Sequence, residues 1–225
     1  MMTAEEKWVY EYHLNPIFDE GAVMALRLAE FVSKNGTRQN MGSVMSVSGF
    51  LGQSMARFPD RFEEWVTAYR DRLGMRDQGR RSILWFAIAL SGLDDAVRLL
   101  ERLESINQAD EEERMAAITL ARLDVRSLEP KESWMLDLLW GCYFGSADRS
   151  FILEILKCVP WITEDGAAAR KINLGRSAYW SIDSNRKALT NVDADVMILL
   201  SENPDLSEAY SFIYEAATTF DPHTS

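Results

Sequence analysis

The sequence has few of the residue types that build metal sites and disulfide frameworks. It holds two cysteines and two histidines among 225 residues, at Cys142, Cys158, His13 and His223. They are not grouped in close pairs, as the ligands of a zinc site usually are. We therefore expect no metal and no cofactor, and we expect both cysteines to be buried, reduced thiols.

Long hydrophobic runs are also missing. The longest strongly apolar run covers 83–90, whereas a membrane-spanning helix needs ~18 such residues. The first residues, MMTAEEKWVYEYHLNP, lack the basic end and the following apolar stretch of a signal peptide. We expect a soluble, cytoplasmic protein that has no membrane partner.

Positive charge is scarce, and it is absent near the C-terminal end. The chain has 24 Lys and Arg against 35 Asp and Glu, a net charge of −11. No Lys or Arg follows Lys187, whereas seven acids do: Asp193, Asp195, Glu202, Asp205, Glu208, Glu215 and Asp221. Such a surface repels phosphate backbones and attracts cationic proteins, so we expect no nucleic-acid partner and favour a basic protein partner. The simpler interpretation of these acids is a set of solvated helix faces.

Motifs for catalysis are absent as well. The chain has no nucleophile elbow, phosphate loop or dinucleotide-binding glycine pattern. Carboxylates that folding brings together could still act as an acid and a base, and Asp94 with Asp95, or the run 110–113, could supply them. Helix capping and a solvated helix start explain both groups better, so we do not expect an enzyme.

One stretch imitates a DNA-reading helix-turn-helix. It runs MGSVMSVSGFLGQSMARF from Met41, with Gly49 where the turn would lie. Few Lys or Arg lie within it, and phosphate contacts supply most of the affinity for DNA. We therefore expect this stretch not to bind DNA.

Apolar residues at helical spacing are abundant, whereas the alternation typical of strands is nearly absent. Amphipathic stripes with this spacing lie at 24–32, 62–73, 151–159 and 192–200. Glycines that follow apolar stretches are expected to close helices: Gly36, Gly74, Gly92 and Gly145. The sequence predicts an all-α protein of about ten helices, whose short connections make neighbouring helices antiparallel.

Two segments resemble each other. ILWFAIALSGLDDAVRLLERL begins at Ile83, and LDLLWGCYFGSADRSFILEIL begins at Leu136. Aligning Gly92 with Gly145 places Asp95 on Asp148. Each copy then reads as an inner apolar helix, a glycine, an aspartate cap and an outer amphipathic helix. A third, weaker copy runs from 177 to 204.

The repeat suggests an architecture. Hairpins of this kind bury their apolar faces only by stacking, so we predict a short α–α superhelix, close in organisation to HEAT and armadillo repeats. Accidental similarity of two amphipathic hairpins is the alternative. No linker is evident, and we predict a single all-helical domain over 1–225 with a weak boundary near 127–133.

One aromatic cluster is a candidate binding site. Arg176, Tyr179, Trp180 and Asp183 fall at i, i+3, i+4 and i+7 of a predicted helix. Aromatic and arginine side chains are enriched at the centres of protein interfaces. The simpler interpretation places Trp180 in the core of the third hairpin and pairs Arg176 with Asp183 on the surface.

Three functions remain open at this point. The sequence favours a non-catalytic module that binds another polypeptide, such as an adaptor or a neutraliser of a basic toxin. An enzyme with a carboxylate-based site in a helical cavity is the first alternative. A subunit that assembles with itself is the second, because seven Trp and ten Met are many for this length.

Overall fold

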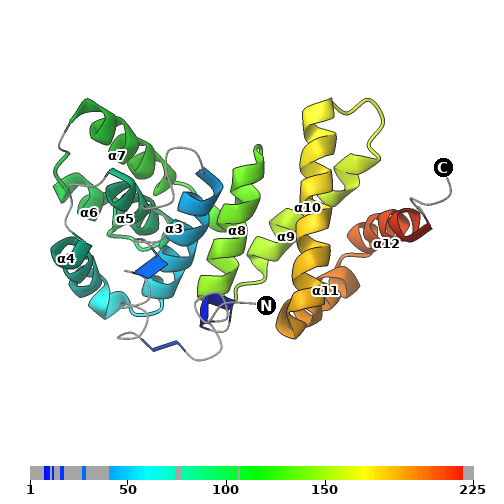
Figure 1. The fold of residues 1–225 in the computed structure, drawn as a ribbon, viewed down its shortest axis with the longest axis horizontal. Coiled ribbons are helices and arrows are strands. Elements are labelled where there is room, and N and C mark those ends of the chain that lie inside the picture. The colour runs from blue at the N-terminus through cyan, green and yellow to red at the C-terminus, as the bar shows by residue number, and fades with distance from the viewer. Residues whose placement is uncertain are drawn as a thin grey trace. The chain divides into compact units, whose positions relative to one another are not determined.

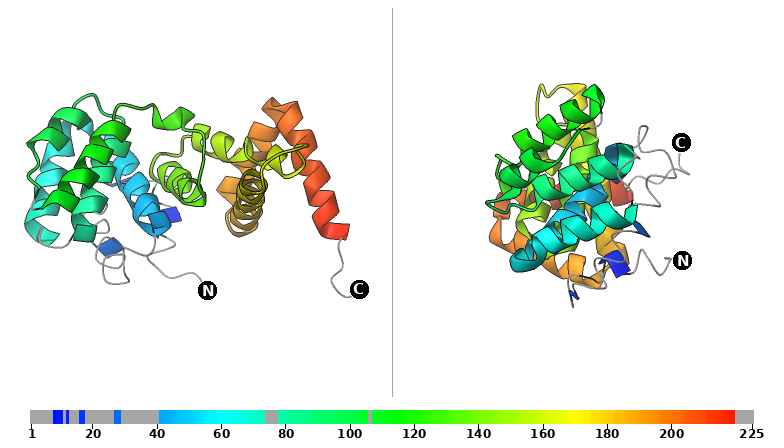
Figure 2. Two further views of the ribbon diagram at one scale, coloured as in Figure 1. Left: turned by 90° about the horizontal axis from the view of Figure 1, so that it is seen from above. Right: turned by 90° about the vertical axis from the view of Figure 1, so that its left-hand side faces the viewer.

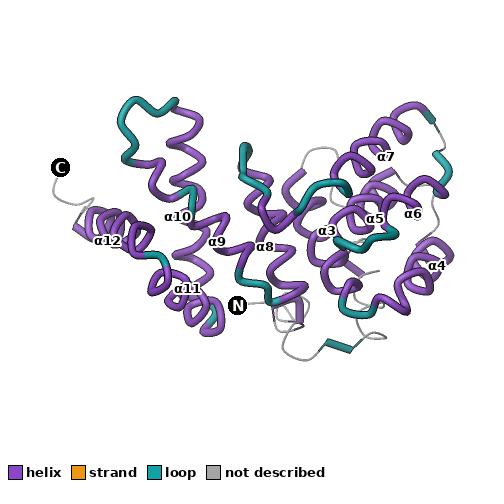
Figure 3. The backbone as a smooth tube through the Cα atoms, turned by 180° about the vertical axis from the view of Figure 1, so that it is seen from behind, coloured by secondary structure: helices purple, strands orange, loops and turns teal. Residues whose placement is uncertain are grey.

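The computed structural model describes residues 8–10, 12, 16–17, 27–28, 41–73, 78–105 and 107–219, without the side chains of 72, 73 and 216–219. These residues form α-helices and short 3-10 helices and contain no strand (Figure 3). The predicted all-α fold is therefore confirmed. Most of the stripe predicted at 24–32 lies outside the described residues, as do Gly36, Gly74 and both histidines.

Figure 1 shows the order of the helices along the chain. The α-helices are α3 (Met41–Ala56), α4 (Phe62–Leu73), α5 (Gln78–Leu90), α6 (Ala96–Arg102), α7 (Gln108–Leu120), α8 (Ser133–Ser146), α9 (Ser150–Leu156), α10 (Ala169–Ala188), α11 (Thr190–Glu202) and α12 (Pro204–Thr219). The 3-10 helices are η3 (Pro59–Arg61), η4 (Val125–Ser127) and η5 (Val159–Ile162).

The chain divides into two compact units. Unit 1 comprises 1–128 and 134–151, and unit 2 comprises 129–133 and 152–225. The segment predicted as a weak boundary is thus shared between the units. The single folding domain and the superhelical stacking stay predictions.

Helix α5 is the centre of unit 1. Its sequence, QGRRSILWFAIAL, is apolar on nearly every side beyond its first turn, and Ile83, Leu84 and Trp85 are fully buried. A helix without a polar face must be covered all round. Helices α3, α4, α6 and α7 all pack against it. The inner position predicted for this helix is confirmed.

Small residues let α3 and α8 approach closely. A Cβ atom added to Gly145 of α8 would lie 2.5 Å from the carbonyl oxygen of Phe50, and one added to Gly141 would overlap the carbonyl oxygen of Ser46. In α3, Gly49 faces the backbone of Leu138 in the same way. These glycines sit where the two backbones meet, a position that no larger residue fits.

One prediction about glycine is therefore wrong. Gly145 does not close its helix but lies inside α8, and Ala147 takes the left-handed conformation two residues later, with φ of 61°. Gly49 makes no turn, because α3 is one continuous helix, so the stretch that imitates a helix-turn-helix does not form that motif. Gly92 does adopt φ of 69°, as predicted.

The two predicted hairpins are similar in length, since α5 has 13 residues and α8 has 14. Placing Gln78 on Ser133, the first residues of α5 and α8, brings Trp85 onto Trp140 and Gly92 onto Ala147. In this alignment Gly92 and Ala147, which both have a positive φ, occupy the same position. The alignment made from the sequence had paired Gly92 with Gly145 instead. Each connection leads to a short helix of 7 residues, α6 or α9.

The predicted aspartate caps of these short helices differ. Asp148 accepts a hydrogen bond from the backbone N–H of Ser150 at 3.0 Å and so caps α9. Asp95 makes no side-chain cap bond to α6 and pairs instead with Arg98 at 2.8 Å. The cap prediction is therefore confirmed for Asp148 and wrong for Asp95.

Unit 2 is built around α10. Gly175 brings this helix against the carbonyl oxygen of Cys158, next to η5. Helix α11 packs on α10, and α12 packs on both α11 and η5. Leu206, Tyr210 and Ile213 repeat at helical spacing and form the inner stripe of α12. The left-hand view of Figure 2 looks along α10 and shows α11 and α12 beside it.

Candidate interaction surface

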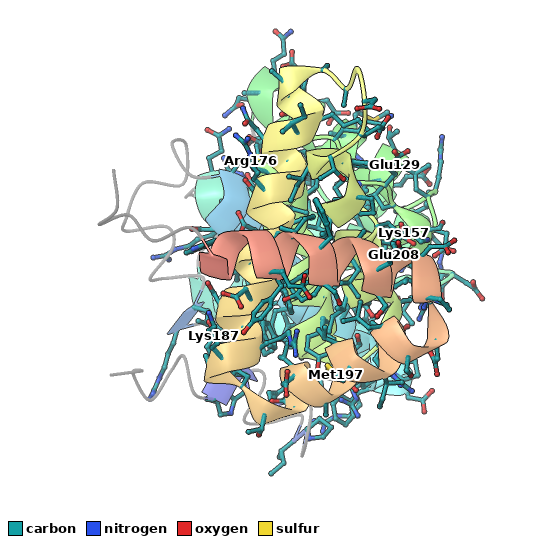
Figure 4. The ribbon with its side chains drawn as sticks, turned by 90° about the vertical axis from the view of Figure 1, so that its right-hand side faces the viewer. Glu129, Lys157, Arg176, Lys187, Met197 and Glu208 are labelled. Atoms are coloured by element: carbon teal, nitrogen blue, oxygen red, sulfur yellow. The ribbon has the colours of Figure 1, made fainter. Side chains whose placement is uncertain are left out.

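Three helices of unit 2 surround an open cleft of about 620 Å³. In Figure 4, α12 crosses in front of α10, and the labelled Lys187 and Met197 lie below it. The lining is mixed, with charged residues from all three helices, apolar and aromatic residues, and serine hydroxyls. Its residues are Asp183, Arg186, Lys187, Asp193, Met197, Leu200, Ser201, Ser207, Tyr210, Ser211, Tyr214 and Glu215.

Two ion pairs hold the cations of this cleft. The Arg186 Nε donates to Asp193 Oδ1 at 2.7 Å, which ties α10 to α11. The Lys187 Nζ donates to Asp183 Oδ2 at 2.7 Å, and this bond raises the pKa of Lys187. Both cations of the cleft are thus already neutralised within the protein, so the cleft is a poor site for an anionic ligand.

Two tyrosines pack together between α10 and α12. The ring centroids of Tyr179 and Tyr210 lie 5.4 Å apart, and the Arg186 guanidinium lies 5.5 Å from the Tyr210 centroid. The Tyr210 hydroxyl is buried without a well-formed hydrogen bond, with Arg186 as its polar neighbour. Burial raises the pKa of Tyr179 to about 12 and also raises the pKa of Tyr210. Both phenols therefore stay neutral near pH 7 and are unsuited to act as bases.

The structure separates the four predicted site residues, although all lie on α10. Asp183 reaches the cleft, and Tyr179 packs on Tyr210. Trp180 is 71% exposed, so the interpretation of Trp180 as a core tryptophan is wrong. Arg176 is exposed, and Asp183 pairs with Lys187 rather than with Arg176. The binding role of these residues stays a prediction.

Sequence reasoning missed the exposed apolar side chains of α11 and α12. Phe212 is 62% exposed, Met197 51% and Ile198 40%. A signal was present for Phe212, which falls off the buried stripe of α12. Large apolar side chains that gather in solvent mark interaction sites more often than single ones do.

Acidic residues accompany these apolar side chains. On α11, Ile198 has Asp195 three residues before it and Glu202 four residues after it. On α12, Phe212 has Glu208 one turn before it and Glu215 one turn after it. Residues at these spacings share one helix face. We call these two faces the acidic-apolar faces; neither contains a cation, because no Lys or Arg follows Lys187.

The carboxylates of the run 110–113, considered for acid–base chemistry, have structural partners. Asp110 is buried against Arg81 at 2.7 Å, and Glu111 binds Arg114 at 2.6 Å. The Glu113 carboxylate accepts from Gln78 at 3.0 Å. Asp110 and Glu113 thus fasten α7 to α5, and Glu111 pairs within α7, so these carboxylates do not form a free acid–base pair.

The cysteines are buried, as expected. Burial raises the pKa of Cys142 and raises the pKa of Cys158 to about 12, so neither thiol is activated. Within the described ranges, no group of three or more His, Cys, Asp or Glu residues is arranged to hold a metal ion. The described helices include none that is long and apolar enough to cross a membrane.

The pKa of the Asp137 carboxyl on α8 is raised by desolvation from neighbouring protein atoms, although its side chain is exposed at the surface. It does not line the cleft of unit 2. A carboxyl with a raised pKa inside a pocket would favour an acid–base site, but here the carboxyl lies in unit 1 and the cleft in unit 2.

Comparison with protein-family models, with curated proteins and with solved structures finds no match to this chain.

Proposed function

We propose that this chain is a non-catalytic interaction protein that binds a basic polypeptide in the cytoplasm through the acidic-apolar faces of α11 and α12. The observation that carries the proposal is the exposure of Ile198 and Phe212 among carboxylates, on a stretch that has no cation. Such a surface suits an adaptor or a neutraliser of a basic toxin.

The two kinds of side chain have separate roles in this proposal. The apolar side chains supply binding free energy, because their exposed area leaves water on contact. The carboxylates speed the encounter with a cationic partner and disfavour anionic ones, including nucleic acid and acidic membranes. Because salt screens these charges, we expect affinity to fall as ionic strength rises.

A pair of matched variants tests the proposal. The first removes three negative charges from α11 and α12, with Glu202→Gln and Glu208→Gln on the acidic-apolar faces and Asp205→Asn one turn before Glu208. The second removes the same amount of charge from unit 1 with Asp94→Asn, Glu101→Gln and Glu104→Gln, all of which are exposed. Tagged wild type and both variants are used to capture proteins from native lysate at low and high salt, and the captured proteins are identified by mass spectrometry.

The expected result is a stoichiometric basic protein that wild type and the unit 1 variant retain at low salt, that high salt releases, and that the α11–α12 variant loses. Equal capture by both variants would show that only net charge matters, and the proposal would then be wrong. Thermal unfolding of all three proteins controls for a change in stability.

A further inference from the structure

Unit 2 holds a cation between an aromatic ring and a carboxylate at two places. The Arg186 guanidinium lies 5.5 Å from the Tyr210 ring centroid and binds Asp193 at 2.7 Å. The Lys171 Nζ lies 5.1 Å from the Trp161 centroid and binds Glu164 at 2.6 Å. At both places the ring face and the carboxylate together replace the water that a cation loses.

A third ring and carboxylate lie together on the outer face of α12. Phe212 is 62% exposed, and Glu208 lies four residues before it on the same helix face. Glu208 is itself exposed, and it has no ion pair with any residue that the structure describes. Asp205, one turn further back, is also exposed and adds to the negative charge of this face. The sequence after Lys187 contains no cation that could occupy this position.

We propose that Phe212 and Glu208 receive an arginine side chain of the bound polypeptide. The inference rests on the proposed function and names the group that the acidic-apolar face of α12 recognises. The guanidinium lies against the ring of Phe212, and one of its N–H groups donates to the Glu208 carboxylate.

Arginine fits this position better than lysine for two physical reasons. Its guanidinium is planar, so it stacks on a ring while its edge donates hydrogen bonds to a carboxylate. It is also more weakly hydrated than an ammonium group, so it loses less on leaving water. Lysine can also lie against a ring, as Lys171 does, but its compact ammonium group is more strongly hydrated and so loses more on contact with Phe212.

Two synthetic peptides test the inference. They share one alternating sequence of leucine, alanine and cationic residues and differ only in having arginine or lysine at every cationic position. Binding of each labelled peptide to the full chain is measured by fluorescence anisotropy, with wild type, Phe212→Leu and Glu208→Gln. The leucine variant keeps an apolar side chain at an exposed site, so folding is retained and only the ring is lost.

Wild type should bind the arginine peptide about two- to five-fold more tightly than the lysine peptide, the range expected for one exposed cation–π contact. Phe212→Leu should remove this preference while leaving the affinity for the lysine peptide nearly unchanged. Glu208→Gln should weaken the binding of both peptides.

Failure of the inference is distinguishable from failure of the proposed function. Equal binding of both peptides, or a preference that survives in Phe212→Leu, would overturn the arginine position while leaving a basic partner in place. Absence of binding by either peptide at low salt would contradict the arginine position and the proposed function together.

Discussion

Arg81 of α5 and Asp110 of α7 form an ion pair, with 2.7 Å between Nη2 and Oδ1, and both side chains are buried, at 3% and 0% exposed. Removing one partner leaves the other's buried charge without its ion pair. We expect Asp110→Ala to lower the free energy of unfolding by about 3–5 kcal/mol, measured by urea denaturation.

The double replacement Arg81→Met with Asp110→Leu is the matched test of that explanation. Because an apolar pair needs no solvation, the double variant should recover much of the lost stability. A double variant as unstable as Asp110→Ala would show that the charges contribute more than their burial costs.

The crossing of α3 and α8 gives a second prediction. Gly141→Ala places a Cβ against the Ser46 carbonyl, and the clash is with backbone, which relieves it only by moving a helix. We expect a loss of about 1–3 kcal/mol in urea denaturation, the usual cost of overpacking. Ser133→Ala, at an exposed position of the same helix, is the control and should change stability little.

Ala147 offers a stabilising substitution. Its φ of 61° costs an alanine about 1–2 kcal/mol, and a glycine adopts this conformation freely. Part of that gain is lost to the greater freedom of glycine in the unfolded chain. We therefore expect Ala147→Gly to raise stability by about 0.5–1 kcal/mol in thermal and urea unfolding. Ala121→Gly, where φ is −61°, should instead lower it.

Asp148 makes the stability of α9 depend on pH. Burial alone would raise the pKa of its carboxyl, but hydrogen bonds from Ser150 and Arg126 outweigh burial and lower the pKa. The stabilisation is therefore present above the ordinary aspartate pKa of ~3.9 and is lost as pH falls through the lower folded value.

A comparison of variants across pH checks this sign. Asp148→Ala should cost about 1 kcal/mol at pH 7, as the loss of a helix cap does. The difference from wild type should shrink in urea titrations below pH 4. A difference that stays constant as pH falls would contradict the role of the ionised carboxylate.

Helix content was predictable from the sequence because helical periodicity is a local property. The stripe of Phe151, Ile152, Ile155 and Leu156, for example, identified α9, and all four side chains are buried. Pro204 occupies the first position of α12, where a proline is well tolerated because that N–H has no partner within the helix.

Local periodicity did not predict which faces of each helix pack against other helices. Glycine both ends helices and lets them cross, so Gly145 and Gly92 look alike in the sequence but act differently in the structure. Trp180 has a large apolar side chain of the kind usually found in a core, yet it lies on a face of α10 that no described helix covers. Which face of a helix meets solvent depends on contacts between elements far apart in the sequence.

The most direct test of the central claim locates the binding surface. Hydrogen exchange of the full chain is measured by mass spectrometry with and without the arginine peptide, at low salt. The account predicts added protection confined to α11 and α12, and loss of that protection in the variant with Glu202→Gln, Asp205→Asn and Glu208→Gln. Protection centred on the helices of unit 1, or retained in that variant, would contradict the account.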